Sequence, residues 1–423
     1  MMKKYYVDKE YSLEAVPQDK RKSFLPMLVV MLGFSFFSVS MLAGGSLRGN
    51  LTIKNFLDAV FYGNLLLCIY TGLLAYMAGD TGLSTHLLSK YSFGEKGSQL
   101  VSFLISITQI GWFGMGIALF SIPASYFIGI DTWILVLISG VLITITAYFG
   151  MKLLIILSVI AVPTIGILGG FSTVKAIEDI GGLINLLYIK PSGIITISTA
   201  LSIVIGSFIS AGIFTPDFAR FAKNKKVAVR STVTAFFIGN SIMFLFGALG
   251  VMTVGSADIS VVMFAQGLII PGIIVLALNI WTTNGNALYG ISLGFTNITK
   301  APKRKMVIVN GLIGTFISIF VYRNLVNWLN LLSTLIPPIG AVMLADYFII
   351  NKRKYVDFKD AKFEYINVNA ILAWLAGTIG AYIIPGIIHL NSVGVAVITY
   401  VILTKLNKNK DIESVEMAKK IAA

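Results

Sequence analysis

The chain has 423 residues, of which 56% are hydrophobic and only 12% are charged, and its mean hydropathy is +0.85. Soluble proteins carry about 25% charged residues, so this composition excludes a soluble globular protein. The aromatic content of 12% excludes a disordered one. The net charge of +14 does not indicate nucleic-acid binding, because the basic residues lie in short segments between apolar runs. An all-α integral membrane protein remains.

Twelve apolar segments are long enough to cross a bilayer, which takes about 20 mostly apolar residues. Gly, Pro, Asn and charged residues separate them, as boundaries between helices should. We therefore predict twelve transmembrane helices at 25–46, 55–78, 98–127, 133–150, 152–175, 194–215, 231–254, 262–284, 306–322, 326–349, 368–387 and 389–405.

The basic residues indicate how the chain is oriented. If the N-terminus is cytoplasmic, only five of the 33 Lys and Arg residues fall in the outer loops: Arg48, Lys54, Lys175, Lys190 and Arg323. Lys and Arg are enriched in cytoplasmic loops. We therefore expect both termini in the cytoplasm and the chain in the cell (inner) membrane.

Helices 1 and 6 contain Gly and Ser at mid-span, in residues 33–40 and 206–212. Gly33 and Gly206 open these runs 173 residues apart, and Gln109 and Asn279 lie 170 apart. These offsets fit an inverted repeat of five helices, because an odd number of spans reverses the direction of the second copy. Interrupted helices at equivalent positions of such repeats mark the substrate site of a transporter. Close packing of small residues is the alternative interpretation.

Helix 8 carries three Asn and two Thr within residues 279–286. Polar groups in a membrane segment need a partner or a cavity, so we expect them at a functional site. Interhelical hydrogen bonding is the alternative. Gly285 in this cluster permits local unwinding of the helix.

The positions of the acidic residues indicate which coupling ion to expect. Only Asp58, Asp217 and Asp346 touch the predicted spans, all near helix ends, and Asp217 is expected to form a surface ion pair with Arg220. No carboxylate is expected where a proton relay needs one. Neutral oxygen ligands, such as the Thr282 hydroxyl, favour Na⁺ over H⁺.

The lack of charged residues inside the predicted spans also indicates the chemical class of the substrate. A charged solute would find no counter-charge, whereas the amides of Gln109, Asn279 and Asn284 offer donors and acceptors, and Trp112 and Phe208 offer flat faces. A neutral, planar heterocycle fits this chemistry, because a base that stacks on an aromatic side chain gains about 1–3 kcal/mol.

Several motifs resemble the cytosine permeases of the nucleobase–cation symporter family, from about residue 16 to residue 405. They are Val-Met-Leu-Gly at 30–33, Gly-Asn-Leu-Leu-Leu at 63–67, Thr-Gly-Leu-Ser-Thr-His-Leu-Leu at 81–88, Thr-Gln-Ile-Gly-Trp-Phe-Gly at 108–114, Gly-Ser-Phe-Ile-Ser-Ala-Gly at 206–212 and Asn-Ile-Trp-Thr-Thr-Asn at 279–284. The chain departs from the family pattern at Gly285, where these permeases usually have Asp. The residues Ile213-Phe214-Thr215-Pro216 also replace a more typical Thr-Leu-Thr-Ala.

This resemblance implies a LeuT-like fold with discontinuous helices 1 and 6. The expected segments are an N-terminal tail (1–24), a first repeat (25–180), a second repeat (190–350), two peripheral helices (366–406) and a C-terminal tail (407–423). It also implies import of cytosine by symport with a cation, which we expect to be Na⁺. The alternative is a proton-coupled permease for uracil, a purine or hydantoin.

The resemblance further implies the site residues. The base would stack between Trp112 and Phe208 and make polar contacts with Gln109, Ser207, Ser210 and Asn284. The cation would bind to carbonyl groups of Gly33, Phe36 and Asn279 and to the hydroxyl groups of Thr282 and Thr283.

Two other classes of protein fit less well. An enzyme would need a catalytic dyad, metal ligands or an intramembrane acid, and Cys68, His86 and His389 are the only cysteine and histidines. A channel would need a ring of charged or carbonyl groups. Beyond the coupling ion we expect no cofactor, and beyond the nucleobase and the lipid bilayer no nucleic acid and no obligate protein partner.

Overall fold

The computed structural model describes residues 10–324, 332 and 334–422. The N-terminal tail expected at 1–24 and helix 10, expected at 326–349, therefore fall partly outside the described residues. The helices run in chain order as α1 (Phe24–Ser35), α2 (Ser38–Asn50), α3 (Ile53–Thr81), α4 (Thr85–Ile128), α5 (Thr132–Phe149), α6 (Met151–Asp179), α7 (Leu183–Tyr188), α8 (Ile197–Gly212), α9 (Thr215–Ala219), α10 (Lys225–Ala235), the π-helix η2 (Phe236–Asn240), α11 (Ser241–Val254), α12 (Ile259–Ala265), α13 (Ile269–Thr299), α14 (Lys303–Arg323), α16 (Pro337–Leu344), the π-helix η3 (Ala345–Ile350), α17 (Val368–Ile383) and α18 (Ile388–Ala422).

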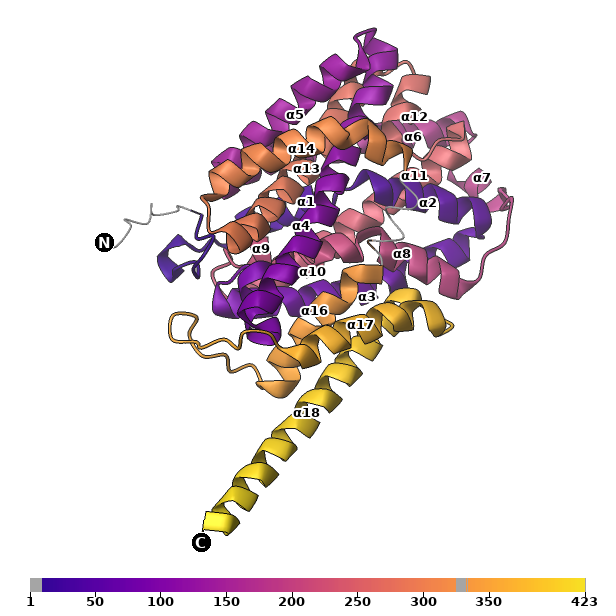
Figure 1. The fold of residues 1–423 in the computed structure, drawn as a ribbon. Helices are drawn as coiled ribbons and strands as arrows, with labels where there is room; N and C mark the ends of the chain where they lie inside the picture. Colours follow the sequence, from indigo (N-terminus) through magenta and orange to yellow (C-terminus); the bar gives the residue numbers. More distant parts are fainter. Residues whose placement is uncertain (1–9, 325–331, 333, 423) are drawn as a thin grey trace.

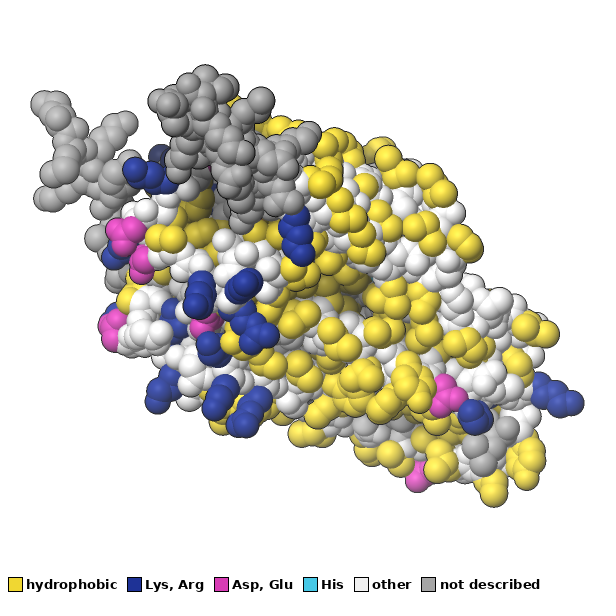
Figure 2. Space-filling model, turned by 90° about the horizontal axis from the view of Figure 1, so that it is seen from below, with side chains coloured by type: hydrophobic (Ala, Val, Ile, Leu, Met, Phe, Trp, Pro, Cys, Tyr) yellow, Lys and Arg dark blue, Asp and Glu magenta, His cyan; other side chains and the backbone are white. Residues whose placement is uncertain are grey.

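Many of these helices are long and apolar enough to cross a membrane. Within the described residues seven qualify alone, and α1 with α2 forms an eighth span that bends by 56°. Large apolar side chains cover the outside, among them Phe61, Leu137, Ile167, Phe316 and Tyr382. Figure 2 shows hydrophobic side chains over much of one face, with Lys and Arg gathered toward one end. A protein with this surface faces lipid.

The helices form two groups (Figure 1). The first group consists of α4, α5, α13 and α14, which pack on one another, and the second of α1, α2, α3, α8, α10 and α11. Helix α6 packs against α1 and α11 of the second group and against α13 of the first. Helices α16, α17 and α18 pack together, and the far end of α18 extends away from the rest (Figure 1). Both groups mix elements from the two halves of the sequence.

Glycine allows the closest of these contacts. A Cβ atom at Gly247 of α11 would lie 1.8 Å from the carbonyl oxygen of Met41, and one at Gly44 of α2 would lie 2.2 Å from that of Phe244. Helices α2 and α11 therefore touch through their backbones, as small residues permit between membrane helices.

Helix α13 corrects two expectations. It runs from Ile269 to Thr299, so the span predicted at 262–284 was too short, and residues 259–265 form the separate helix α12. The error arises because the end of α13 is rich in Asn, Gly and Thr, which are buried against other helices and not against lipid. The helix also continues through Gly285, so the predicted local unwinding is absent.

Candidate functional site

The break in the first span lies between the two helix groups. Helix α1 ends at Ser35 and α2 begins at Ser38, so helix 1 is interrupted as predicted. The side chain of Asn279, on α13, bridges the break: its Nδ2 donates to the Phe36 carbonyl at 3.0 Å, and its Oδ1 accepts from the Ser38 hydroxyl. Since Asn279 is only 1% exposed, these bonds tie the broken helix to the first group.

The five predicted cation ligands all lie on α1, on α13 or in the break after α1. Phe36 and Asn279 are in direct contact, and Gly33 is buried on α1 one turn before the break. The hydroxyl groups of Thr282 and Thr283 donate to the Asn279 carbonyl at 3.0 and 2.9 Å. These five residues thus bring neutral oxygen groups together close to an interrupted helix, and backbone carbonyl groups at broken helices coordinate coupling cations in transporters.

A cavity of about 330 Å³ begins beside the break. Ligand pockets have volumes of about 300–1,000 Å³ and mostly apolar walls with a few polar groups. Here the polar groups include Gln109 of α4 and Ser207 and Ser210 of α8, beside the ring of Trp112. The cavity reaches the surface at Thr199, an exposed residue at the start of α8.

The amide oxygen of Gln109 has no hydrogen-bond partner among the residues that the structure describes. The side chain is 2% exposed, and no hydrogen bond to Oε1 forms within the described part of the chain. A buried, unpaired acceptor costs about 1–3 kcal/mol. A ligand with an N–H group in the cavity would remove this penalty.

The two serines of α8 are already bonded through their hydrogens. The Ser207 hydroxyl donates to the Val204 carbonyl at 2.8 Å, and the Ser210 hydroxyl donates to the Leu332 carbonyl at 3.0 Å. Their oxygens therefore face a ligand as acceptors.

The two aromatic side chains expected to hold the base are separated by a third. The Phe37 ring lies 4.9 Å from the Trp112 ring and 5.4 Å from the Phe208 ring. Trp112 lines the cavity, whereas Phe208 is 1% exposed and packs edge-on against Phe34 and Phe236. A base between Trp112 and Phe208 would require Phe37 to move.

Asn284 is held on the other side of Trp112. Its Nδ2 donates to the Phe113 carbonyl at 2.7 Å, and it lines a small space shared with Trp112 and Thr283. A Cβ atom at Gly116 would lie 2.3 Å from the Asn284 Oδ1, so this glycine makes room for the amide. The amide is thus fixed with its oxygen as the remaining acceptor.

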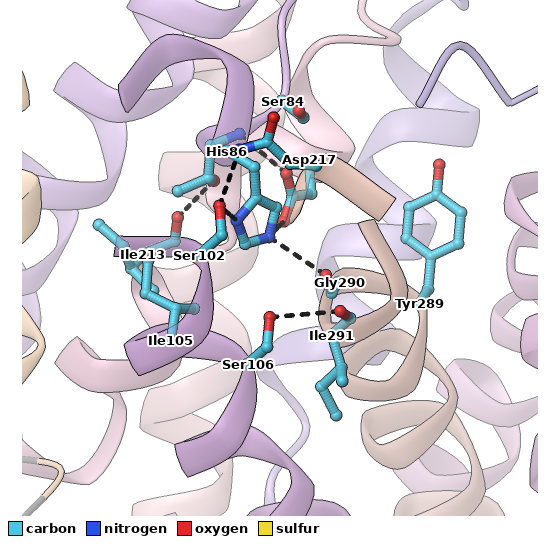
Figure 3. A network of polar contacts seen from close by, with 12 residues as sticks. Ser84, His86, Ser102, Ile105, Ser106, Ile213, Asp217, Tyr289, Gly290 and Ile291 are labelled. Atoms are coloured by element: carbon cyan, nitrogen blue, oxygen red, sulfur yellow. Dashed lines mark hydrogen bonds and ion pairs between the residues drawn. The ribbon is translucent and has the colours of Figure 1, made fainter. Parts of the chain in front are cut away.

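Asp217 corrects another expectation. It is fully buried, so the predicted surface ion pair is wrong. Its Oδ1 accepts from the backbone N–H of Thr85 at 2.9 Å, and its Oδ2 lies 3.9 Å from the His86 Nε2 (Figure 3). The Thr85 hydroxyl donates to the Ile213 carbonyl at 2.8 Å, between α8 and α9. Helix α4 is thus bonded to the break in helix 6, between α8 and α9, and one of these bonds is to a buried carboxylate. A buried carboxylate at this position weakens the argument against proton coupling.

His86 has defined bonding roles. Its Nε2 is 3.2 Å from the Gly290 carbonyl, which can only accept, so this nitrogen carries the proton. Its Nδ1 lies 3.1 Å from the Ser102 hydroxyl, which can then donate. Figure 3 shows the ring between α4 and α13, beside Asp217. In the sequence His86 is one residue of the motif at 81–88, and nothing in that motif predicts that it lies beside Asp217.

Arg220 joins several segments on the side of the protein where Asp217 and His86 lie. Its side chain is fully buried, and its guanidinium donates to the carbonyl groups of Tyr11 at 2.6 Å and Glu10 at 2.9 Å and to the Tyr289 hydroxyl at 3.0 Å. The Glu10 carboxylate accepts from the backbone N–H of Met151. The segment before α1 therefore covers the meeting point of α6, α9 and α13.

Known proteins resemble this chain over nearly its whole length. A family model described as permease for cytosine/purines, uracil, thiamine, allantoin matches residues 15–403. The cytosine permease of Escherichia coli strain K12 is 48% identical over 403 residues, which is 95% of this chain and 96% of that protein. The hydantoin permease of Microbacterium maritypicum is 23% identical over 347 residues, or 74% and 70% of the two chains.

Solved transporter structures share the fold. Mhp1, a nucleobase-cation-symport-1 family transporter in a closed conformation with bromovinylhydantoin, matches 93% of this chain and 95% of its own with a TM-score of 0.84 at 17% identity. Inward-facing Mhp1 matches with a TM-score of 0.78. A Na⁺-coupled sialic acid symporter matches with 0.68. The resemblance found in the sequence is confirmed: the chain is a transporter and not an enzyme, and it belongs to the family of permeases for cytosine and purines, uracil, thiamine and allantoin.

Proposed function

We propose that this protein imports cytosine together with a cation, Na⁺, by alternating access. The observation that carries the proposal is Gln109, which lines the cavity beside Trp112 and whose buried amide oxygen lacks a partner among the described residues. A nucleobase supplies both a flat face for the indole and an N–H group for the amide. The 48% identity to a cytosine permease supports cytosine as the base.

The base stacks on Trp112 after Phe37 moves aside, and Phe208 supplies the second face. Gln109 and the hydroxyl oxygens of Ser207 and Ser210 accept hydrogen bonds from the base. Phe37 also lines the small space beside Asn284, so its movement exposes the Asn284 Oδ1, fixed by the bond from its own Nδ2 to Phe113, as a further acceptor. Several acceptors together favour a base with an exocyclic amino group.

The cation binds where α13 meets the break after α1. Its ligands are the carbonyl groups of Gly33, Phe36 and Asn279 with the hydroxyl groups of Thr282 and Thr283. All are neutral oxygens, and the Phe36–Asn279 contact brings the two elements together. Loading this site fastens the broken helix to α13 and thereby shapes the cavity for the base.

Both termini lie in the cytoplasm, and the twelve spans form two inverted repeats of five helices and two peripheral helices in the cell membrane. In this orientation the cavity at the start of α8 opens outward. The buried bonds of Arg220 and Asp217 close the cytoplasmic side. Transport then requires the cavity to close and these buried bonds to separate.

Uptake of labelled cytosine into proteoliposomes tests the proposal. An inward Na⁺ gradient should accelerate uptake relative to an equal choline gradient. Gln109→Ala should weaken cytosine uptake, whereas Gln99→Ala, an exposed amide on the same helix, should not. Uptake that ignores Na⁺ would contradict the coupling, and a normal Gln109→Ala variant would contradict the site.

A proton-coupled permease for uracil, a purine or hydantoin is a second candidate. The buried carboxylate of Asp217, 3.9 Å from His86, favours its proton coupling, because this carboxylate can take up a proton at the contact between α4 and α9. A pH gradient that drives uptake without Na⁺, and that Asp217→Asn abolishes, would support this candidate over Na⁺ symport.

A further inference from the structure

Ser158 of α6 lies directly against α1 at the predicted cation ligand Gly33. A Cβ atom at Gly33 would be 2.4 Å from the Ser158 Oγ, so the absence of a side chain at this glycine lets the hydroxyl reach the α1 backbone. Ser158 is only 1% exposed. Its hydroxyl thus faces the last turn of α1, where helix carbonyl groups lose their intrahelical partners.

The Ser158 hydroxyl also has no partner of its own in the described part of the chain. No hydrogen bond to or from Oγ forms among the described residues. A serine in a helix can bond to the carbonyl group one turn earlier, and Thr164 on the same helix does so with Ile160 at 2.7 Å. Ser158 does not form this bond, although an unpaired buried hydroxyl is energetically unfavourable. The group is therefore available to a ligand.

The packing of α6 on α13 places Ser158 opposite Thr282. The two helices are antiparallel: Lys303, just after α13, contacts Ala147, just before α6, while Ser172 near the end of α6 bonds to Gln266 just before α13. Leu154 contacts Gly285. One turn further along α6 is Ser158, and one turn back along α13 lie residues 281 and 282.

From this geometry we propose that the Ser158 hydroxyl is a further ligand of the cation, an inference that rests on the proposed Na⁺ site. Helix α6 is in contact with α1 and with α13, the two elements that carry the other ligands. A hydroxyl is a hard oxygen ligand of the kind that the rest of the site supplies. With this ligand the site is enclosed by three helices, and Na⁺ binding also depends on the position of α6.

The test measures Na⁺ binding without transport. The purified protein in detergent is titrated with NaCl, at constant ionic strength with choline chloride, and the melting temperature and cytosine binding are followed. Ser158→Ala should raise the Na⁺ concentration for half-maximal stabilisation about fivefold, which is the loss expected for one polar contact of about 1 kcal/mol. Ser158→Cys keeps the size but offers a soft ligand, so it should show the same shift.

Two further readings separate a ligand from a structural residue. Without Na⁺ both variants should melt no lower than the wild type, because they remove an unpaired group. Cytosine affinity at saturating Na⁺ should be unchanged, and Thr164→Val should behave as the wild type throughout. Wild-type Na⁺ dependence in Ser158→Ala would overturn the inference alone, whereas a wild-type protein that ignores Na⁺ would overturn the Na⁺ site and this ligand together.

Discussion

The two sides of the proposed substrate site are built differently. On the side of α2 and α8, a cavity of about 330 Å³ is lined by Gln109, whose buried amide oxygen has no partner among the described residues. On the other side Arg220 is fully buried and its guanidinium donates to three oxygens of other segments. The first side, the cavity side, thus has polar groups that a ligand can bind. On the second, the packed side, the polar groups bind one another.

This difference indicates which bonds have to break when the proposed transporter changes conformation. Ligand binding can satisfy the cavity side directly. The packed side opens only when its buried bonds separate, and these bonds join α9 and Arg220, directly after it, to α4, α13 and the segment before α1. In the proposed mechanism, substrate and ion therefore act on the break between α1 and α2, which is bonded to α13.

The largest effect is expected from breaking the packed side. Arg220→Met retains bulk but removes the bonds to Glu10, Tyr11 and Tyr289. Each hydrogen bond to a charged group contributes about 1.5–3 kcal/mol, so we expect a loss of at least ~3 kcal/mol of stability. The melting temperature should fall, and trypsin should cleave faster after Lys20, because the segment before α1 is released.

Lys226→Met is the matched control, since it removes a positive charge from an exposed position in the neighbouring helix α10. It should leave both readings unchanged. Equal melting temperatures for Arg220→Met and the wild type would contradict the view that this network holds the packed side closed.

On the cavity side, the largest effect should come from the stacking face. Trp112→Ala should weaken cytosine binding by about 1–3 kcal/mol, or roughly 5- to 150-fold. Trp133→Ala, at an exposed position of α5, serves as control. Equilibrium binding of labelled cytosine to the folded variants measures both, and unchanged affinity in Trp112→Ala would remove this ring from the site.

The fixed amide of Asn284 leads to a prediction about base selectivity, the preference for cytosine over uracil. Cytosine carries an amino donor where uracil carries a carbonyl group, and an acceptor that cannot rotate is left facing another acceptor when uracil binds. The mismatch costs about 1–3 kcal/mol, so cytosine should be preferred at least tenfold. Cytosines substituted at position 5 should be tolerated better than uracil, because they retain the amino group.

Competition of unlabelled bases with labelled cytosine uptake measures this preference. Asn284→Ala should reduce it, and so should Gly116→Ala, since a Cβ atom there would displace the amide. Gly170→Ala, where a Cβ atom meets open space, is the control. If uracil competes as well as cytosine in the wild type, another base is carried, and Gly285 is the first residue to substitute.

The cavity side could be predicted from sequence far better than the packed side. Gln109 and Trp112 lie side by side in a short motif, and Gly and Ser mark the break after Ser35, so residue type carries the signal. The partners of Arg220 are backbone carbonyl groups, which every residue has, so no pattern identifies them. Asp217 was expected at the surface because it lies near a helix end, but the packing of α3 and α4 against α9 buries it.

The smallest effects are expected at the junction of the two sides, where α13 meets the broken helix. Thr283→Ala and Thr282→Ala each remove one hydroxyl ligand of the proposed cation site. A single polar contact contributes about 1 kcal/mol, so the Na⁺ concentration for half-maximal cytosine uptake should rise about fivefold. Apparent cytosine affinity should fall as well, because coupling between two binding sites is reciprocal. Thr299→Ala is the matched control, since its hydroxyl bonds back to Phe295 at the exposed end of the same helix. If the two variants lower cytosine affinity but leave the Na⁺ dependence unchanged, these hydroxyls belong to the cavity side and not to the junction.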